Sequence, residues 1–96
     1  MTKRDEYVDK LKAQLEQWNT QVTQWEAKAG EAQAHLRAGY EKQLQAVRRQ
    51  RNEAMEQMRR VQAASGDAWM DLVQGADDAW SKMREAFEKA RTHFNK

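Results

Sequence analysis

Apolar residues recur with a seven-residue period through the first third of the chain, and this repeat constrains the fold more than any other feature. The spacings alternate between three and four residues for four heptads. This pattern predicts an α-helix that packs through a narrow stripe, as in a left-handed coiled coil. The stripe consists of Val8, Leu11, Leu15, Trp18, Val22, Trp25, Ala29, Ala32 and Leu36.

The same stripe continues into the middle of the chain. After Leu36 the spacings lengthen to an eleven-residue step, which locally relaxes a left-handed supercoil. Thr2 and Asp5 resemble a capping box at the start of the helix, with aspartate in place of the usual glutamate. The core positions expected in the middle segment are Leu36, Tyr40, Leu44, Val47, Met55, Met58 and Val61.

The clearest signal for a turn is the sequence Ser65, Gly66 and Asp67. Glycine can end a helix in the left-handed conformation, and aspartate can cap the next helix. There is no proline in the chain. We therefore predict an all-α fold with a long first helix over about residues 4–64 and a second helix over about 67–94.

Gly30 is the other candidate for a break. A break there would give three helices of similar length, and hence a three-helix bundle. However, the flanking residues favour helix, and the heptad passes through Gly30 without a slip. A lone glycine costs about 1 kcal/mol relative to alanine and does not have to end a helix. A continuous helix is therefore predicted, with the three-helix bundle as the alternative.

The last segment contains an eleven-residue repeat in which Asp67-Ala68-Trp69 aligns with Asp78-Ala79-Trp80. Eleven residues span close to three helical turns, so the repeated tryptophans lie along one face. The expected core of this helix is Trp69, Val73, Ala76, Trp80, Met83, Phe87 and Phe94.

Folding the chain at Gly66 pairs the two apolar stripes as an antiparallel hairpin. Leu36 then lies level with Phe94. Arg51, a charge on the inner stripe, lies level with Trp80, where its guanidinium can stack on the ring. Because the apolar residues of two independently identified stripes coincide, a helical hairpin is predicted for this part of the chain.

The hairpin, made of residues 37–64 and 67–94, leaves the N-terminal stripe without a partner. A continuous first helix would be about 90 Å long, and its N-terminal half would project about 50 Å beyond the hairpin. Such an exposed seam favours association. We expect the single domain, residues 1–96, to self-associate through residues 1–36, most simply as an antiparallel two-fold dimer. In a three-helix bundle the same stripe would instead cover the hairpin of its own molecule.

The sequence offers no pattern for catalysis or for a cofactor. It has no cysteine and two histidines, His35 and His93, which are expected at the surface. No nucleophile–histidine–acid set, di-iron motif or glycine-rich phosphate loop occurs. No segment resembles a signal peptide or a membrane span. A non-enzymatic, cytoplasmic protein without metal or cofactor is expected.

Charge and aromatic content narrow the choice of partner. The net charge is +2, and the basic excess lies in residues 37–66, where glutamates interrupt it. No aromatic residues alternate with these bases, which disfavours a nucleic-acid partner. Amphipathic repeats with tryptophan can lie in a lipid interface, but the acids of residues 67–78 would be repelled by anionic lipid. Tryptophans that pack a protein core are the favoured interpretation.

A family of small, largely uncharacterised bacterial coiled-coil proteins, described as stress-response-like, resembles this chain in segments 3–8, 11–15, 18–19, 63–69, 79–80 and 85–87. The resemblance implies helical structure, a bacterial cytoplasmic setting and a link to stress, and it supplies no catalytic residues. The expected function is self-association or protein binding. The alternative is a peripheral protein that binds a lipid surface.

Overall fold

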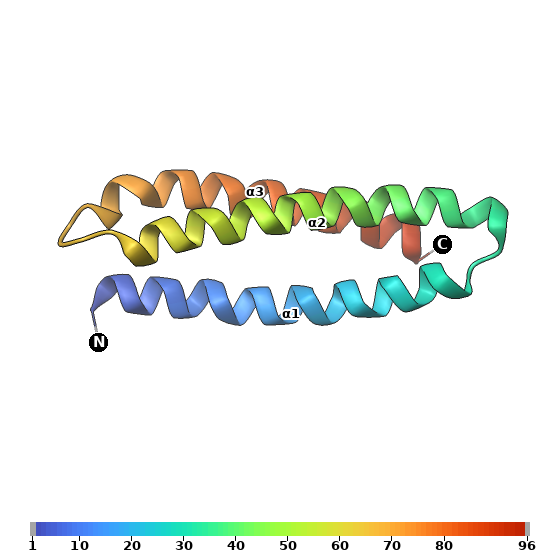
Figure 1. Cartoon of the computed structure of the whole chain (residues 1–96), viewed down its shortest axis with the longest axis horizontal. Coiled ribbons are helices and arrows are strands. Elements are labelled where there is room, and N and C mark those ends of the chain that lie inside the picture. The colour runs from blue at the N-terminus through green and yellow to red at the C-terminus, as the bar shows by residue number, and fades with distance from the viewer. Residues whose placement is uncertain (1, 96) are drawn as a thin grey trace.

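Three helices form an elongated bundle. The structure, a computed structural model, describes residues 2–95. Its elements are α1 (Lys3–Glu31), α2 (Ala34–Ala63) and α3 (Trp69–Phe94), with no strand in this range. The bundle measures 52 × 20 × 17 Å, and consecutive helices run in opposite directions (Figure 1). The N-terminus therefore lies at the end that holds the α2–α3 connection, and the C-terminus lies at the opposite end.

The start of α1 carries the predicted capping box. The Asp5 backbone N–H donates to Thr2 Oγ1 at 3.1 Å, and the Thr2 N–H donates to the Asp5 carboxylate at 3.5 Å. Asp5 and Glu6 lie in the first turn, where negative charge complements the helix dipole. The N-terminal boundary of α1 is thus set by local sequence.

The predicted continuous helix over residues 4–64 is wrong, because α1 ends at Glu31. Ala32 and Gln33 are extended, with ψ of 149° and 153°. Gly30 itself is helical, and the break follows two residues later, so the alternative three-helix bundle fits. The physical reason is that a fold back at this point covers the apolar stripe within one molecule, without the entropy loss of bringing two molecules together.

The second connection turns at the predicted glycine. Gly66 has φ of 55°, in the left-handed region that glycine adopts at little cost. The Ser65 carbonyl accepts a hydrogen bond from the Ala68 N–H at 3.1 Å. Helix α3 begins at Trp69, two residues later than predicted, and no side chain caps it, so the expected capping by Asp67 does not occur.

One apolar core runs along the axis of the bundle, and all three helices contribute to it. No polar or charged residue within residues 2–95 is buried. Alanines allow close packing of the helices at several levels of this core. The buried residues are Val8, Leu11, Leu15, Val22, Trp25, Ala29, Leu44, Val47, Ala54, Met58, Val61, Ala76, Ala79, Trp80, Met83, Phe87, Ala90 and Phe94.

Helices α2 and α3 form the expected antiparallel hairpin, but the side-chain pairing differs from the prediction at its open end. The Tyr40 ring stacks on Phe94, with centroids 4.6 Å apart, whereas the sequence pairing places Leu36 there. Leu36 is consequently 46% exposed. The helices approach closely beside this stack, because a Cβ atom on Gly39 would lie 3.0 Å from the His93 ring.

Candidate functional site

The stripe predicted for self-association lies inside the molecule. We call these eight residues the α1 seam: Val8, Leu11, Leu15, Trp18, Val22, Trp25, Ala29 and Ala32. Six of them are buried, whereas Trp18 and Ala32 are partly exposed. In the closed bundle the α1 seam faces the hairpin of its own chain, so another molecule can reach it only when α1 leaves.

The residues predicted for the hairpin core occupy three environments. Leu44, Val47, Met58, Val61, Ala76, Trp80, Met83, Phe87 and Phe94 are buried. Tyr40, Met55, Trp69 and Val73 are partly exposed, and Leu36 is exposed. The alanines at positions 54, 79 and 90 are also buried, although they are absent from the predicted set.

All eight aromatic residues of the chain lie in two clusters between α1 and the hairpin, which we call the aromatic layer. Tyr7 contacts Trp69 near the N-terminal end of the bundle, with ring centroids 6.2 Å apart. The larger cluster extends from Trp80 to the far end. Its members are Trp18, Trp25, Tyr40, Trp80, Phe87 and Phe94, with neighbouring centroids 4.6–5.7 Å apart.

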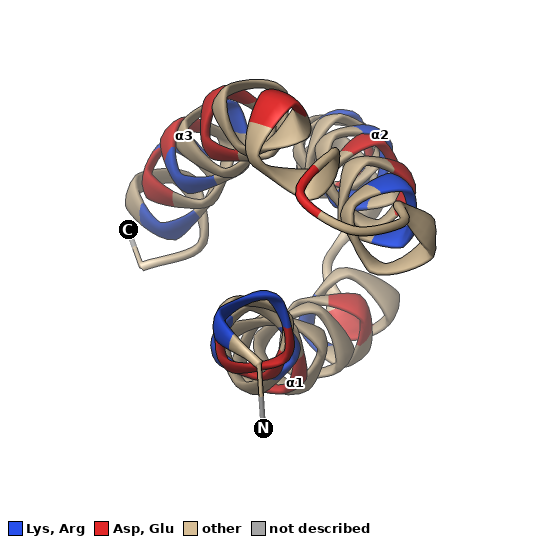
Figure 2. Ribbon diagram, turned by 90° about the vertical axis from the view of Figure 1, so that its left-hand side faces the viewer, with Lys and Arg blue, Asp and Glu red and all other residues tan. Residues whose placement is uncertain are grey.

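The aromatic layer sets how α1 meets α3. The backbones of α2 and α3 pack closely, and α1 packs against α2, whereas α1 and α3 meet mainly through side chains. Figure 2 shows the wider spacing of the α1 and α3 ribbons, which the large rings bridge. Helix α1 therefore has one close helical neighbour, and its contact with the other depends on a few rings.

A row of polar side chains flanks the α1 seam on the side of α3. Its members are Tyr7, Gln14 and Lys28, at multiples of seven residues. The Tyr7 hydroxyl donates to a carboxylate at 2.6 Å, Gln14 accepts from an indole N–H, and Lys28 donates to a main-chain carbonyl. This row was not predicted from the sequence, although its seven-residue period was a usable signal. The partners on α3 are, in the same order, Asp77, Trp80 and Phe94.

Tyr7 is held in its neutral form. Burial, together with the hydrogen bond to Asp77 and the charge of that carboxylate, raises the pKa of Tyr7 well above its ordinary value. The phenol therefore acts as a hydrogen-bond donor that links α1 to α3. This link lies at the edge of the bundle, where water reaches both groups.

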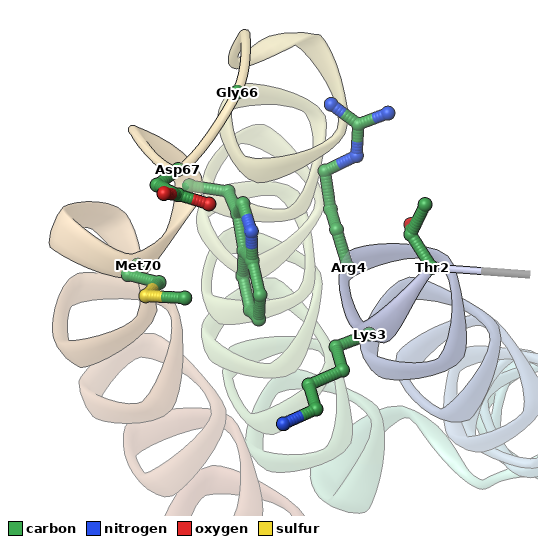
Figure 3. Close-up of a pocket in the computed structure, with 7 residues that line it drawn as sticks. Thr2, Lys3, Arg4, Gly66, Asp67 and Met70 are labelled. Atoms are coloured by element: carbon green, nitrogen blue, oxygen red, sulfur yellow. The ribbon is translucent and has the colours of Figure 1, made fainter.

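Both ends of α1 supply a cation to the end of another helix. Arg4 donates to the carbonyl of Ala64, at the C-terminus of α2, and Lys28 donates to the carbonyl of Phe94, at the C-terminus of α3. These carbonyls have no partner within their own helices and carry the negative end of the dipole. Figure 3 shows Arg4 and the connection that carries Gly66, which both line a pocket of about 460 Å³.

Few charges hold α1 to α2. Arg48 and Glu26 form the one ion pair between helices within residues 2–95, at 3.1 Å and partly exposed to water. Arg51 makes long hydrogen bonds to Asn19 and Asn52, at 3.4 and 3.5 Å, and its buried Nε has no partner. The expected stacking of Arg51 on Trp80 does not occur within residues 2–95, where the Trp80 ring packs against Trp18 instead.

The described residues do not form a metal site. Within residues 2–95, no three His, Cys, Asp or Glu side chains gather closely enough to bind a metal ion. His35 is exposed, and the His93 ring lies nearly perpendicular to the Tyr40 ring, with centroids 5.5 Å apart. None of the three helices combines the length and the apolar character needed to cross a membrane.

No protein-family model, curated protein or solved structure matches this chain. The resemblance to small bacterial coiled-coil proteins therefore stays a prediction.

Proposed function

We propose that the protein is a non-enzymatic helical binding module in which α1 is a releasable arm. In the closed bundle the hairpin covers the α1 seam. When α1 leaves, the seam and the complementary groove on the hairpin both become available to a helical partner. The observation that carries the proposal is the attachment of α1 to α3 through rings and polar side chains, without close backbone packing.

The polar contacts of α1 support an arm that can open. The pair Arg48–Glu26 is partly exposed, and such pairs contribute only about 0–1 kcal/mol. The buried Nε of Arg51 lacks a partner in the closed state and regains water when α1 leaves. An unsatisfied buried donor costs about 1–3 kcal/mol, so this atom favours opening.

The resemblance to stress-response-like proteins supports a role for this module in the bacterial cytoplasm under stress. Protein binding through amphipathic helices uses anchors at helical spacing, and the α1 seam has that spacing. The residues proposed to bind the partner are those of the α1 seam on one side and the hairpin core on the other.

Amide hydrogen exchange of the dilute monomer tests the arm. We expect amides of α1 to exchange through a partial opening that has a lower free energy than the unfolding of the hairpin. Exchange of all three helices at one common free energy would refute the proposal.

A pair of variants makes this test specific. Arg51→Met removes the unsatisfied donor from the interface and should slow the exchange of α1 by about fivefold or more, since about 1 kcal/mol corresponds to that factor. Arg49→Met, at an exposed position of the same helix, is the matched control and should leave the exchange of α1 unchanged. Equal effects of the two variants would contradict the assigned role of Arg51.

The aromatic layer favours a second candidate, binding to a lipid surface. Release of α1 would expose tryptophan and tyrosine side chains, which partition into the membrane interface. Because the first half of α3 carries Asp71, Asp77 and Asp78, zwitterionic vesicles should be preferred over anionic ones. Flotation with both kinds of vesicle tests this candidate. Absence of the protein from both floating fractions would exclude it.

A further inference from the structure

We propose that two copies of this chain exchange α1, so that α1 of each copy packs on the α2–α3 hairpin of the other. This inference rests on the proposed function, because it names the partner that accepts the released α1 seam. Each copy gives and receives the same surface. The resulting assembly is therefore a closed dimer with two-fold symmetry.

The connection between α1 and α2 has weak signals for a turn. Ala32 and Gln33 have φ of −71° and −64°, values that also occur in helices, so a change in ψ alone makes them helical. Gln33 forms no side-chain cap, and the first turn of α2 has no acidic residue. By contrast, the other connection turns at Gly66 with positive φ. A helix that continues through residues 32–33 is therefore accessible to this sequence.

Continuity through the connection satisfies backbone groups that the closed bundle leaves without helical partners. The last carbonyls of α1 and the first N–H groups of α2 are such groups. One of them is satisfied by a side chain, because Arg37 donates to the Ala32 carbonyl at 3.1 Å. A continuous helix would supply regular hydrogen bonds to the others, which favours the exchanged form.

The contacts of α1 with the hairpin are the same in both forms. Whether the hairpin belongs to the same molecule or to a second copy, Lys28 meets the carbonyl of Phe94, and Tyr7 meets Asp77. The two forms therefore differ only in the connection, in the surface created beside it and in the entropy of association. High protein concentration offsets the entropy cost of association and shifts the equilibrium from the closed monomer toward the exchanged dimer.

Leu36 is a second, independent observation that points to a second copy. Within residues 2–95 it is one of two large apolar side chains that are exposed, and it lies three residues after the connection. In a continuous helix it follows Ala32 by four residues, on the same face. The two long helices of an exchanged dimer meet at this segment across the two-fold axis, so exchange covers the residue that the closed bundle leaves exposed.

The two forms differ strongly in size. A continuous helix over residues 3–63 would be about 90 Å long, at about 1.5 Å per residue. The closed bundle is 52 Å long. An exchanged dimer therefore has twice the 11.3 kDa mass of the chain and is far longer than the monomer.

During refolding from urea at high protein concentration, each α1 can pack either on the hairpin of its own molecule or on that of a second copy. Light scattering then measures the mass, and small-angle X-ray scattering measures the maximum dimension. Gln33→Pro should block exchange, because proline fits φ of −64° and the extended Ala32 before it, but interrupts a continuous helix. Gln33→Ala, which keeps the helix possible, is the matched control.

We expect the unmodified chain and Gln33→Ala to form a dimer at least about 90 Å long, as the length of the continuous helix requires. Gln33→Pro should lower the dimer fraction by at least about tenfold, because proline is strongly disfavoured inside a helix. A monomer under all conditions, a compact dimer, or a dimer that persists in Gln33→Pro would overturn the inference. If α1 opens in hydrogen exchange but no exchanged dimer forms, this inference fails while the proposed function stands.

Discussion

Replacement of Trp25 by alanine should remove a large part of the stability of the bundle. The Trp25 side chain is 3% exposed, lies parallel to the Phe94 ring at 5.2 Å and contacts Phe87 at 5.3 Å. Trp→Ala substitutions at buried sites cost about 3–5 kcal/mol. A chain of this length has a free energy of unfolding of roughly 5–14 kcal/mol. The variant should therefore lose between about a fifth and nearly all of its stability.

Urea unfolding followed by far-UV circular dichroism measures this loss. With a slope of about 1–3 kcal/mol/M, the midpoint should fall by at least about 1 M. Trp69→Ala is the matched control, because Trp69 is partly exposed and its one ring contact, with Tyr7, is 6.2 Å between centroids. It should cost about 1 kcal/mol, in line with half of a fully buried side chain. Equal losses in the two variants would refute the central role assigned to the larger aromatic cluster.

Two further predictions concern helix packing and pH. Gly75→Ala should stabilise the protein by about 0.5–1 kcal/mol through helix propensity, because the Gln57 amide oxygen, which would lie 3.2 Å from the new Cβ, ends a flexible side chain that can move away. Gly39→Ala should gain less stability, because its Cβ would lie 3.0 Å from the His93 ring. Thermal melts should show this difference between the two glycine variants, and the difference should disappear when His93→Ala is added to both. Because the pKa of Tyr7 is raised, its hydrogen bond contributes fully to the free energy of unfolding below about pH 10. This contribution is lost as the pH rises above that value, since only the neutral phenol donates to Asp77. Urea midpoints of the unmodified chain and Tyr7→Phe should therefore converge with rising pH, and a constant difference would contradict this link.

The sequence determined the features that depend on neighbouring residues. The capping box of Thr2 and Asp5 and the turn at Gly66 were both predicted, because each is built from residues within one turn of each other. The apolar stripes of all three helices were also readable, since the helical period alone places their residues on one face. These features fix three amphipathic segments and one sharp turn.

The tertiary structure alone decided whether the chain breaks at Ala32 and Gln33. Their local preferences suit a continuous helix. The apolar stripe of α1 can be buried either by the hairpin of the same molecule or by that of another molecule. Whether the helix breaks here therefore depends on long-range packing and on the entropy of association, and neither can be predicted from local sequence.

The same limit applies to the partners across the bundle. The row that includes Tyr7, Gln14 and Lys28 has a visible seven-residue period, but its partners on α3 follow from the rotation of α1 about its own axis. Large rings between α1 and α3 set that rotation and hold the two backbones apart. The sequence thus specified which faces are buried, and the packing of bulky side chains from distant segments decided which faces meet.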